Sequence, residues 1–143
     1  MKITAKTFDE LNKRELYEIL KIRSAVFVVE QECAYQDIDG CDMAALHLMM
    51  YDGDEIKAYL RIFVNEQGRV QIGRMLSVER RKGYARKLLN EGINRAVSHF
   101  GAKKIYLEAQ SYAKELYRRA GFVEISDEFD LDGIPHVEMM LEL

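Results

Sequence analysis

The sequence has few of the features that mark secreted, membrane-spanning or disulfide-stabilised proteins. Only two cysteines, Cys33 and Cys41, occur in 143 residues. Two cysteines make a poor disulfide framework, so we expect free thiols. The opening residues, MKITAKTFDE, contain no apolar stretch of the length that a secretory signal needs. No run of about 18 apolar residues occurs anywhere, so no membrane-spanning helix is expected. These absences predict a cytoplasmic protein.

Proline is almost absent as well, with Pro135 as its one occurrence, and the chain has no low-complexity tract or internal repeat. Nothing therefore divides it, and we expect a single domain over residues 1–143. With 48% hydrophobic and 31% charged residues, the composition fits a soluble globular domain. The net charge of -3 gives no general reason to expect nucleic acid or an anionic membrane as a partner.

Hydrophobic periodicity predicts alternating strands and helices. Asn12 and Glu15 resemble a capping box ahead of an amphipathic helix. Asp52-Gly53 between two alternating runs predicts an antiparallel hairpin, and Gly101 is placed to end a long helix. Strands are expected over 3–8, 45–51, 56–64, 70–78, 103–107, 122–126 and 136–143, and helices from 12 to about 27, over 83–100 and over 111–120. The order β-α-β-β-β-α-β-α-β-β is that of a mixed α/β domain.

The junction between the strand ending near Val78 and the helix beginning near Gly83 carries the clearest chemical signal. The first amides of a helix have no internal acceptor and lie at the positive end of its dipole, so this junction predicts an anion site. Gly83 would let the backbone approach a phosphate closely. The alternative is a helix start whose basic residues are simply solvated. The basic residues gathered here are Arg80, Arg81, Lys82 and Arg86.

These elements resemble the GNAT superfamily of N-acetyltransferases. Arg80, Gly83 and Ala85 match its Q/R-x-x-G-x-G/A signature, and Tyr117 precedes Ala120-Gly121-Phe122 as the family's tyrosine commonly does. The element order agrees over nearly the whole chain. The segments AVFVVEQ (25–31), YQDIDG (35–40) and DGIPH (132–136) are similar to the ElaA-like branch of that superfamily.

The resemblance implies an α/β fold with a mixed, mostly antiparallel sheet, whose two central parallel strands splay apart and which helices flank. It implies acetyl-CoA as co-substrate, with the pantetheine arm between the splayed strands. The residues that would bind the coenzyme are Leu76, Ser77, Val78, Arg81, Lys82, Gly83, Tyr84, Ala85 and Arg86.

The expected reaction is acetyl transfer to a primary amine, which requires loss of a proton from the amine and a departing thiolate. The resemblance assigns Tyr117 as the acid that protonates the thiolate; an ordinary half-buried aromatic is the alternative. Residues 73–78 contain no glutamate to serve as base. His136 and His47 are the favoured pocket residues and proton relays, with Glu30 and Glu108 left as candidates. Residues that would orient a small-molecule or peptide amine are Arg23, Glu30, Gln31 and Gln110.

Two other classes of protein remain as alternatives. One is a non-catalytic coenzyme A-binding sensor or assembly domain. The other is an RNA-contacting protein that uses the basic turn RRKGYARK, although the net charge and the lack of clustered stacking aromatics argue against it. Asp37, Asp39 and Asp42 resemble part of a calcium loop, but Gly40 stands at the wrong position for an EF-hand. The histidines and cysteines fit no zinc spacing, so no metal is predicted.

Overall fold

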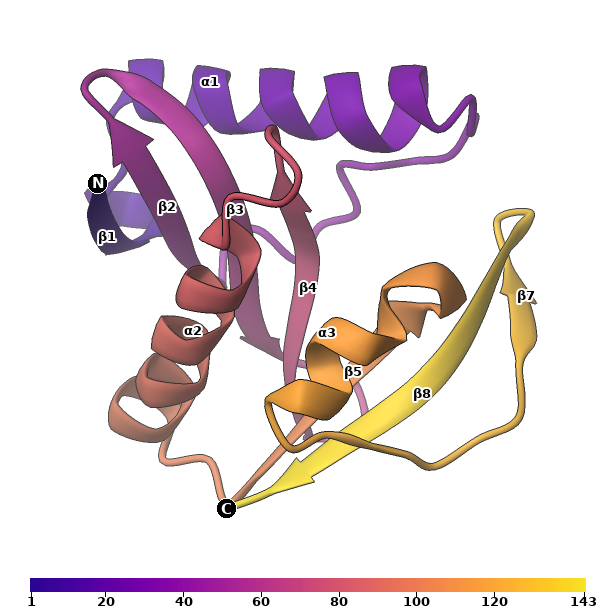
Figure 1. Cartoon of the computed structure of the whole chain (residues 1–143). Coiled ribbons are helices and arrows are strands. Elements are labelled where there is room, and N and C mark those ends of the chain that lie inside the picture. The colour runs from indigo at the N-terminus through magenta and orange to yellow at the C-terminus, as the bar shows by residue number, and fades with distance from the viewer.

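An eight-stranded sheet forms the centre of the molecule, in the order β1-β2-β3-β4-β5-β8-β6, with β7 paired to β8 (Figure 1). This is a computed structural model, and it describes residues 1–143. The strands are β1 (Lys2–Thr7), β2 (Leu46–Asp52), β3 (Glu55–Val64), β4 (Val70–Ser77), β5 (Lys104–Gln110), β6 (Val123–Glu124), β7 (Phe129–Leu131) and β8 (Ile134–Glu142). The α-helices are α1 (Lys13–Arg23), α2 (Tyr84–Phe100) and α3 (Lys114–Arg119). A π-helical segment, η2 (Ser24–Glu30), continues α1, and the 3-10 turns η1 (Phe8–Glu10) and η3 (Ser111–Ala113) complete the elements.

The two central strands are parallel and diverge, which confirms the expected fold class. β4 and β5 pair only at Gln71 and Tyr106, whereas every other strand pair is antiparallel. Beyond that point the strands separate toward their carboxyl ends, as Figure 1 shows. The separation opens the middle of the sheet to other elements.

Two hydrophobic clusters, one on each face of the sheet, fix the helices. Ala58, Leu60 and Ile62 of β3 project to one face and pack with Leu88 and Leu89 of α2. The alternate residue Tyr59 projects to the other face and packs with Ile19 of α1 and with Phe27 of η2. Period-two alternation in β3 therefore serves both layers.

Local signals at the helix ends agree with the sequence. Asn12 Oδ1 accepts from the Glu15 amide at 2.8 Å and Glu15 Oε1 from the Asn12 amide at 2.9 Å, a complete capping box. Gly101 closes α2 in the left-handed region, at φ 64°. The hairpin at Asp52-Gly53 also forms, with Asp52 opposite Glu55.

The C-terminal third departs from the prediction. Only 114–119 are α-helical, because the chain first makes the 3-10 turn η3. Ser111 does not cap the helix, and its hydroxyl instead donates to Glu128 at 2.9 Å. The strand expected over 122–126 is limited to β6, and β7 was not predicted. None of the helices is long and apolar enough to cross a membrane.

Candidate active site

A cavity of about 530 Å³ occupies the gap between the splayed strands. Its walls come from β4 and β5, the start of α2, the helix α3, the segment η2 and the turn between β7 and β8. Elements far apart in sequence therefore contribute to one space. Among the predicted site residues, those that line it are Glu30, Gln31, Leu76, Ser77, Val78, Arg81, Gly83, Tyr84, Ala85, Arg86, Gln110, Tyr117 and His136.

One end of the cavity is the start of α2. Gly83 precedes the helix at φ 75°, and Arg81 also lies in the left-handed region at φ 63°. The first amide of the helix to reach a backbone carbonyl is that of Lys87, which donates to Gly83 at 3.2 Å. The amides of Tyr84 and Ala85 therefore have no helical acceptor, and no side chain caps them. Such amides, together with Arg81 and Arg86, suit an anion.

Lys82 is the exception among the predicted coenzyme residues. It is exposed and does not line the cavity, unlike Arg81 and Gly83 on either side of it. The two left-handed residues that flank it turn the backbone there. Lys82 thus lies in the turn between Arg81 and Gly83, and its part in coenzyme binding stays a prediction.

Strand β4 carries a bulge at the mouth of the splay that the sequence did not indicate. Tyr59 of β3 is opposite Leu76, and Arg61 is opposite Gly73, so β4 has one extra residue between these pairs. Arg74 lies in this bulge at φ 51°. A bulge leaves a residue unpaired in the ladder, and Arg74 and Met75 both line the cavity.

Tyr117 reaches the cavity from α3. Its ring packs edge-on against Phe122, with 6.1 Å between centroids. Its hydroxyl faces β4 across the gap and donates to Met75 Sδ at 3.7 Å, a weak acceptor. Burial raises the pKa of the Tyr117 hydroxyl, so the group stays protonated at neutral pH. A protonated hydroxyl without a strong acceptor is available as a proton donor.

His136 lines the cavity from the start of β8. The residue is 8% exposed, and its Nδ1 lies 2.7 Å from the carbonyl oxygen of Ile134. Because a carbonyl can only accept, Nδ1 carries a hydrogen. Nε2 has no hydrogen-bond partner in the protein, since Nδ1 makes the ring's one such bond. In the neutral ring Nε2 holds a lone pair.

Gln31 and Gln110 bridge the two sides of the site. The amide nitrogen of Gln31 donates to Gln110 Oε1 at 3.2 Å, and the reverse contact is 3.3 Å. This pair links the end of η2 to the end of β5. Glu30 lies at the rim, where its carboxylate is 3.6 Å from Arg80.

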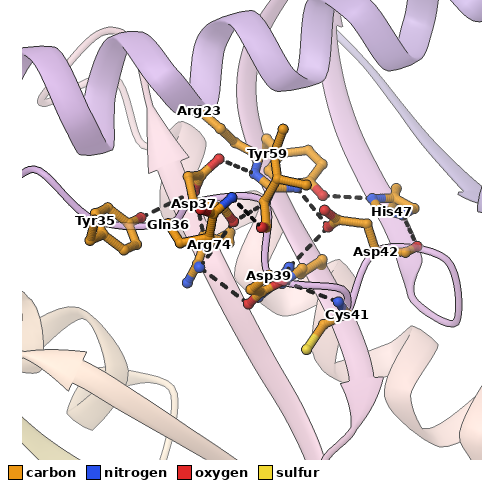
Figure 2. Close-up of polar contacts among 12 residues, drawn as sticks. Arg23, Tyr35, Gln36, Asp37, Asp39, Cys41, Asp42, His47, Tyr59 and Arg74 are labelled. Carbon is orange, nitrogen blue, oxygen red and sulfur yellow. Dashed lines mark hydrogen bonds and ion pairs between the residues drawn. The ribbon is translucent and has the colours of Figure 1, made fainter.

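A buried ionic network fixes the loop between η2 and β2 against the sheet (Figure 2). Arg23 contacts Asp37 at 3.1 Å and Asp42 at 2.7 Å, and Arg61 contacts Asp42 at 2.9 Å and also binds Asp39. Although burial alone would raise it, the hydrogen bonds from Arg61 and from the Cys41 amide hold the pKa of Asp39 well below its usual range. Asp39 is therefore ionised in the folded protein.

Arg23 and His47 belong to this network and not to the cavity, which corrects two predictions. Both side chains are fully buried and neither lines the site. His47 Nδ1 is 2.6 Å from the hydroxyl of Tyr59, and Nε2 is 2.9 Å from the carbonyl oxygen of Asp42. With both nitrogens occupied, His47 has no free position for an amine or a proton relay, and Arg23 cannot contact an amine.

The loop between η2 and β2 also contributes side chains to the cavity. Tyr35 and Cys33 line it, and Cys33 Sγ lies 3.1 Å from the carbonyl oxygen of Asp132 in the turn between β7 and β8. Glu108 of β5 and the exposed Tyr112 line it too. Contacts between distant loops carry no periodic pattern, so no sequence signal marked Cys33, Tyr35 or Tyr112 as lining residues, whereas Glu108 was already a candidate base.

Comparison with known proteins gives consistent matches. Residues 9–143 match the Acetyltransferase (GNAT) domain family. A UPF0039 protein of Schizosaccharomyces pombe is 43% identical over 96% of this chain and 95% of its own. Protein ElaA of Escherichia coli is 36% identical over 94% and 92% of the two chains. The crystal structure of an acyl-CoA N-acyltransferase from Pseudomonas aeruginosa is 35% identical, covers 99% of both chains and superposes with a TM-score of 0.92.

Proposed function

Because the chain belongs to the GNAT acetyltransferase family, we propose that it transfers the acetyl group of acetyl-CoA to a primary amine. The observation that carries this proposal is the cavity in the splay, which has unpaired helix amides at one end and both Tyr117 and His136 on its walls. The helix amides suit the phosphates of the coenzyme, Tyr117 suits the departing thiolate, and His136 suits the attacking amine.

The residues present fit coenzyme A. The amides of Tyr84 and Ala85 and the side chains of Arg81 and Arg86 would hold the pyrophosphate, as helix starts commonly hold phosphates. The separated edges of β4 and β5 leave room for an extended arm, and Leu76 supplies an apolar wall. When bound, the coenzyme supplies the activated acetyl group as a thioester.

Tyr117 is the proposed general acid. A thiol of pKa about 8.5 leaves more readily when its sulfur receives a proton. The hydroxyl of Tyr117 now contacts only the thioether of Met75, and a developing thiolate is a much stronger acceptor. Its raised pKa keeps the proton in place until that moment.

His136 is the proposed base. Amines with pKa about 10.4 are mostly protonated at pH 7, so a group in the site must accept a proton. The carbonyl of Ile134 fixes the Nδ1–H tautomer and leaves Nε2 as the acceptor. The bulge at Arg74 interrupts the regular pairing of β4 with β3, and a backbone N–H released there would stabilise the negative charge that grows on the carbonyl oxygen during attack.

Acetyl-CoA turnover tests the proposal directly. The protein is incubated with acetyl-CoA and a panel of primary amines, free thiol is followed continuously, and the acetylated product is identified by mass. Amine-dependent thiol release with an equal amount of acetamide is expected. Tight binding of coenzyme A with no release in the presence of any amine would instead identify a non-catalytic coenzyme A-binding domain.

A further inference from the structure

Two carboxylates lie directly opposite each other on neighbouring strands beside the site. In the antiparallel pair β5–β8, Glu108 is opposite Glu138. The flanking residues Leu107 and Ala109 belong to the core beneath α2 and α3, so the two glutamates project from the other face. Like charges at directly opposed positions destabilise a sheet. Glu108 is exposed and Glu138 is half-buried, so solvent screens part of this repulsion.

No cation of the protein offsets this pair. Neither glutamate forms an ion pair, while Arg74 is occupied by Asp37 at 2.8 Å and by Asp39 at 3.2 Å. Glu108 accepts a hydrogen bond from the hydroxyl of Tyr106 at 3.3 Å. Burial and the charges of Glu108 and Glu138 raise the pKa of Tyr106. Arg69 lies over the ring of Tyr106, 5.0 Å from its centre, and not against either carboxylate.

The next residue pair of the same ladder contains His136. Gln110 is opposite His136, so His136 is two residues from Glu138 and on the same face. His136 is 8% exposed, and its Nε2 is unpartnered. Glu108 and His136 both line the cavity. The unpartnered Nε2 of His136 thus belongs to the same face of the ladder as two carboxylates that have no ion-pair partner.

The spacing of these groups indicates the length of the ligand. Along a strand, the Cα atoms of residues two apart, such as His136 and Glu138, are separated by about 6.6–6.8 Å. A chain of four methylene groups holds its two nitrogens at a comparable separation. We propose that the amine acceptor is an aliphatic diamine or polyamine, with one nitrogen at His136 Nε2 and a second, charged nitrogen between Glu108 and Glu138.

The inference rests on the proposed acetyl transfer and narrows its substrate. The first nitrogen, once neutral, bonds to the acetyl carbon and gives a proton to His136. The carbon–sulfur bond breaks, the departing thiolate takes a proton from Tyr117, and solvent restores the proton of Tyr117 and removes that of His136. The second nitrogen remains an ammonium ion and offsets the carboxylate pair throughout. An acceptor with a carboxylate in place of that ammonium would add a third negative charge to the same place.

Three acceptors of similar length show whether a second ammonium group is recognised. We compare kcat/KM for 1,4-diaminobutane, butylamine and 4-aminobutanoate at saturating acetyl-CoA. A charge-assisted contact predicts a value about 10-fold or more higher for the diamine than for butylamine, mostly through KM, and the lowest value for 4-aminobutanoate. Equal values for the diamine and butylamine would overturn the inference while leaving acetyl transfer established. Failure of every amine would overturn both.

Variants locate the second nitrogen. Glu138→Gln should lower the ratio of diamine to butylamine kcat/KM toward one, and should not lower the melting temperature of the free protein, because it relieves the repulsion with Glu108. The matched control is Glu142→Gln, on the same strand and face but paired with Lys104 at 3.7 Å, which should keep the parent ratio. An unchanged ratio in Glu138→Gln would overturn the assignment of this site.

Discussion

Arg74, the bulge residue of β4, donates from Nε to Asp37 Oδ1 at 2.8 Å. This contact ties the strand at the mouth of the cavity to the loop between η2 and β2. Arg74 also has φ 51°, a region that side chains with a Cβ rarely adopt. The ion pair therefore holds a backbone conformation that costs free energy.

Substitution of Arg74 separates the ion pair from the backbone. Arg74→Ala and Arg74→Gly both remove the contact with Asp37, but only glycine relieves the left-handed conformation. We expect the glycine variant to be more stable than the alanine variant by about 1 kcal/mol. Urea unfolding measures the difference. Equal stability of the two variants would show that the bulge relaxes once the side chain is removed.

Gly83→Val tests the pyrophosphate site. A Cβ at Gly83 meets no atom within 4 Å, but φ is 75°, so the substitution strains the turn and places a branched side chain at the helix start. We expect a loss of coenzyme A affinity, measured by calorimetry. The matched control is Gly68→Val, at φ 78° and with equally open surroundings, in the turn between β3 and β4. It should lose comparable stability and keep its affinity; similar affinity in both variants would place the phosphates elsewhere.

Tyr117→Phe tests the general acid. The ring contact with Phe122 remains, and the lost hydroxyl contact to Met75 is weak, so stability should change little. Loss of general acid catalysis predicts a fall in kcat of about 10²–10⁴-fold, with coenzyme affinity nearly unchanged. Tyr112→Phe, an exposed tyrosine at the cavity, is the control. A fall of less than about threefold, with chemistry limiting the rate, would make Tyr117 a packing residue.

His47 makes stability depend on pH. Burial lowers the pKa of His47, so the unfolded chain, with a histidine pKa near about 6.5, binds the proton more readily than the folded protein does. The stabilising contribution of His47 to the free energy of unfolding is complete above about pH 6.5, and it is lost as the pH falls toward the pKa of His47 in the folded protein. His47→Gln should therefore flatten the dependence of unfolding free energy between pH 7.5 and about 5.5. A slope equal to that of the parent in His47→Gln would contradict this assignment.

The parts of the fold that were predicted correctly depend on neighbouring residues. The capping box of Asn12 and Glu15, the hairpin at Gly53 and the stop at Gly101 are local, and the long helix α2 has strong periodicity. The short strand β7 was not predicted, because three residues are too few to show hydrophobic alternation. α3 begins late because Ser111 bonds to Glu128, a contact that sequence spacing does not express.

The lining of the cavity was anticipated best where one segment supplies it. The turn at Gly83 holds its uncapped helix amides within four residues, so the motif marked a segment that lines the cavity. Arg23 and His47 were misplaced because their burial depends on Asp37 and Asp42, which approach only when the loop folds over the sheet. The opposition of Glu108 and Glu138 is likewise a matter of strand register, which neither strand reveals alone.

The single pairing of β4 with β5 at Gln71 and Tyr106 has a consequence for colloidal behaviour. Past that pair, two strands in the middle of the sheet present unmatched backbone donors and acceptors to each other across a gap. Such borders act as templates for foreign strands, and proteins normally protect them at the periphery. Under the proposed function, coenzyme A would fill the gap and provide that protection. Saturation with coenzyme A should thus protect the protein against aggregation as well as supply its reactant.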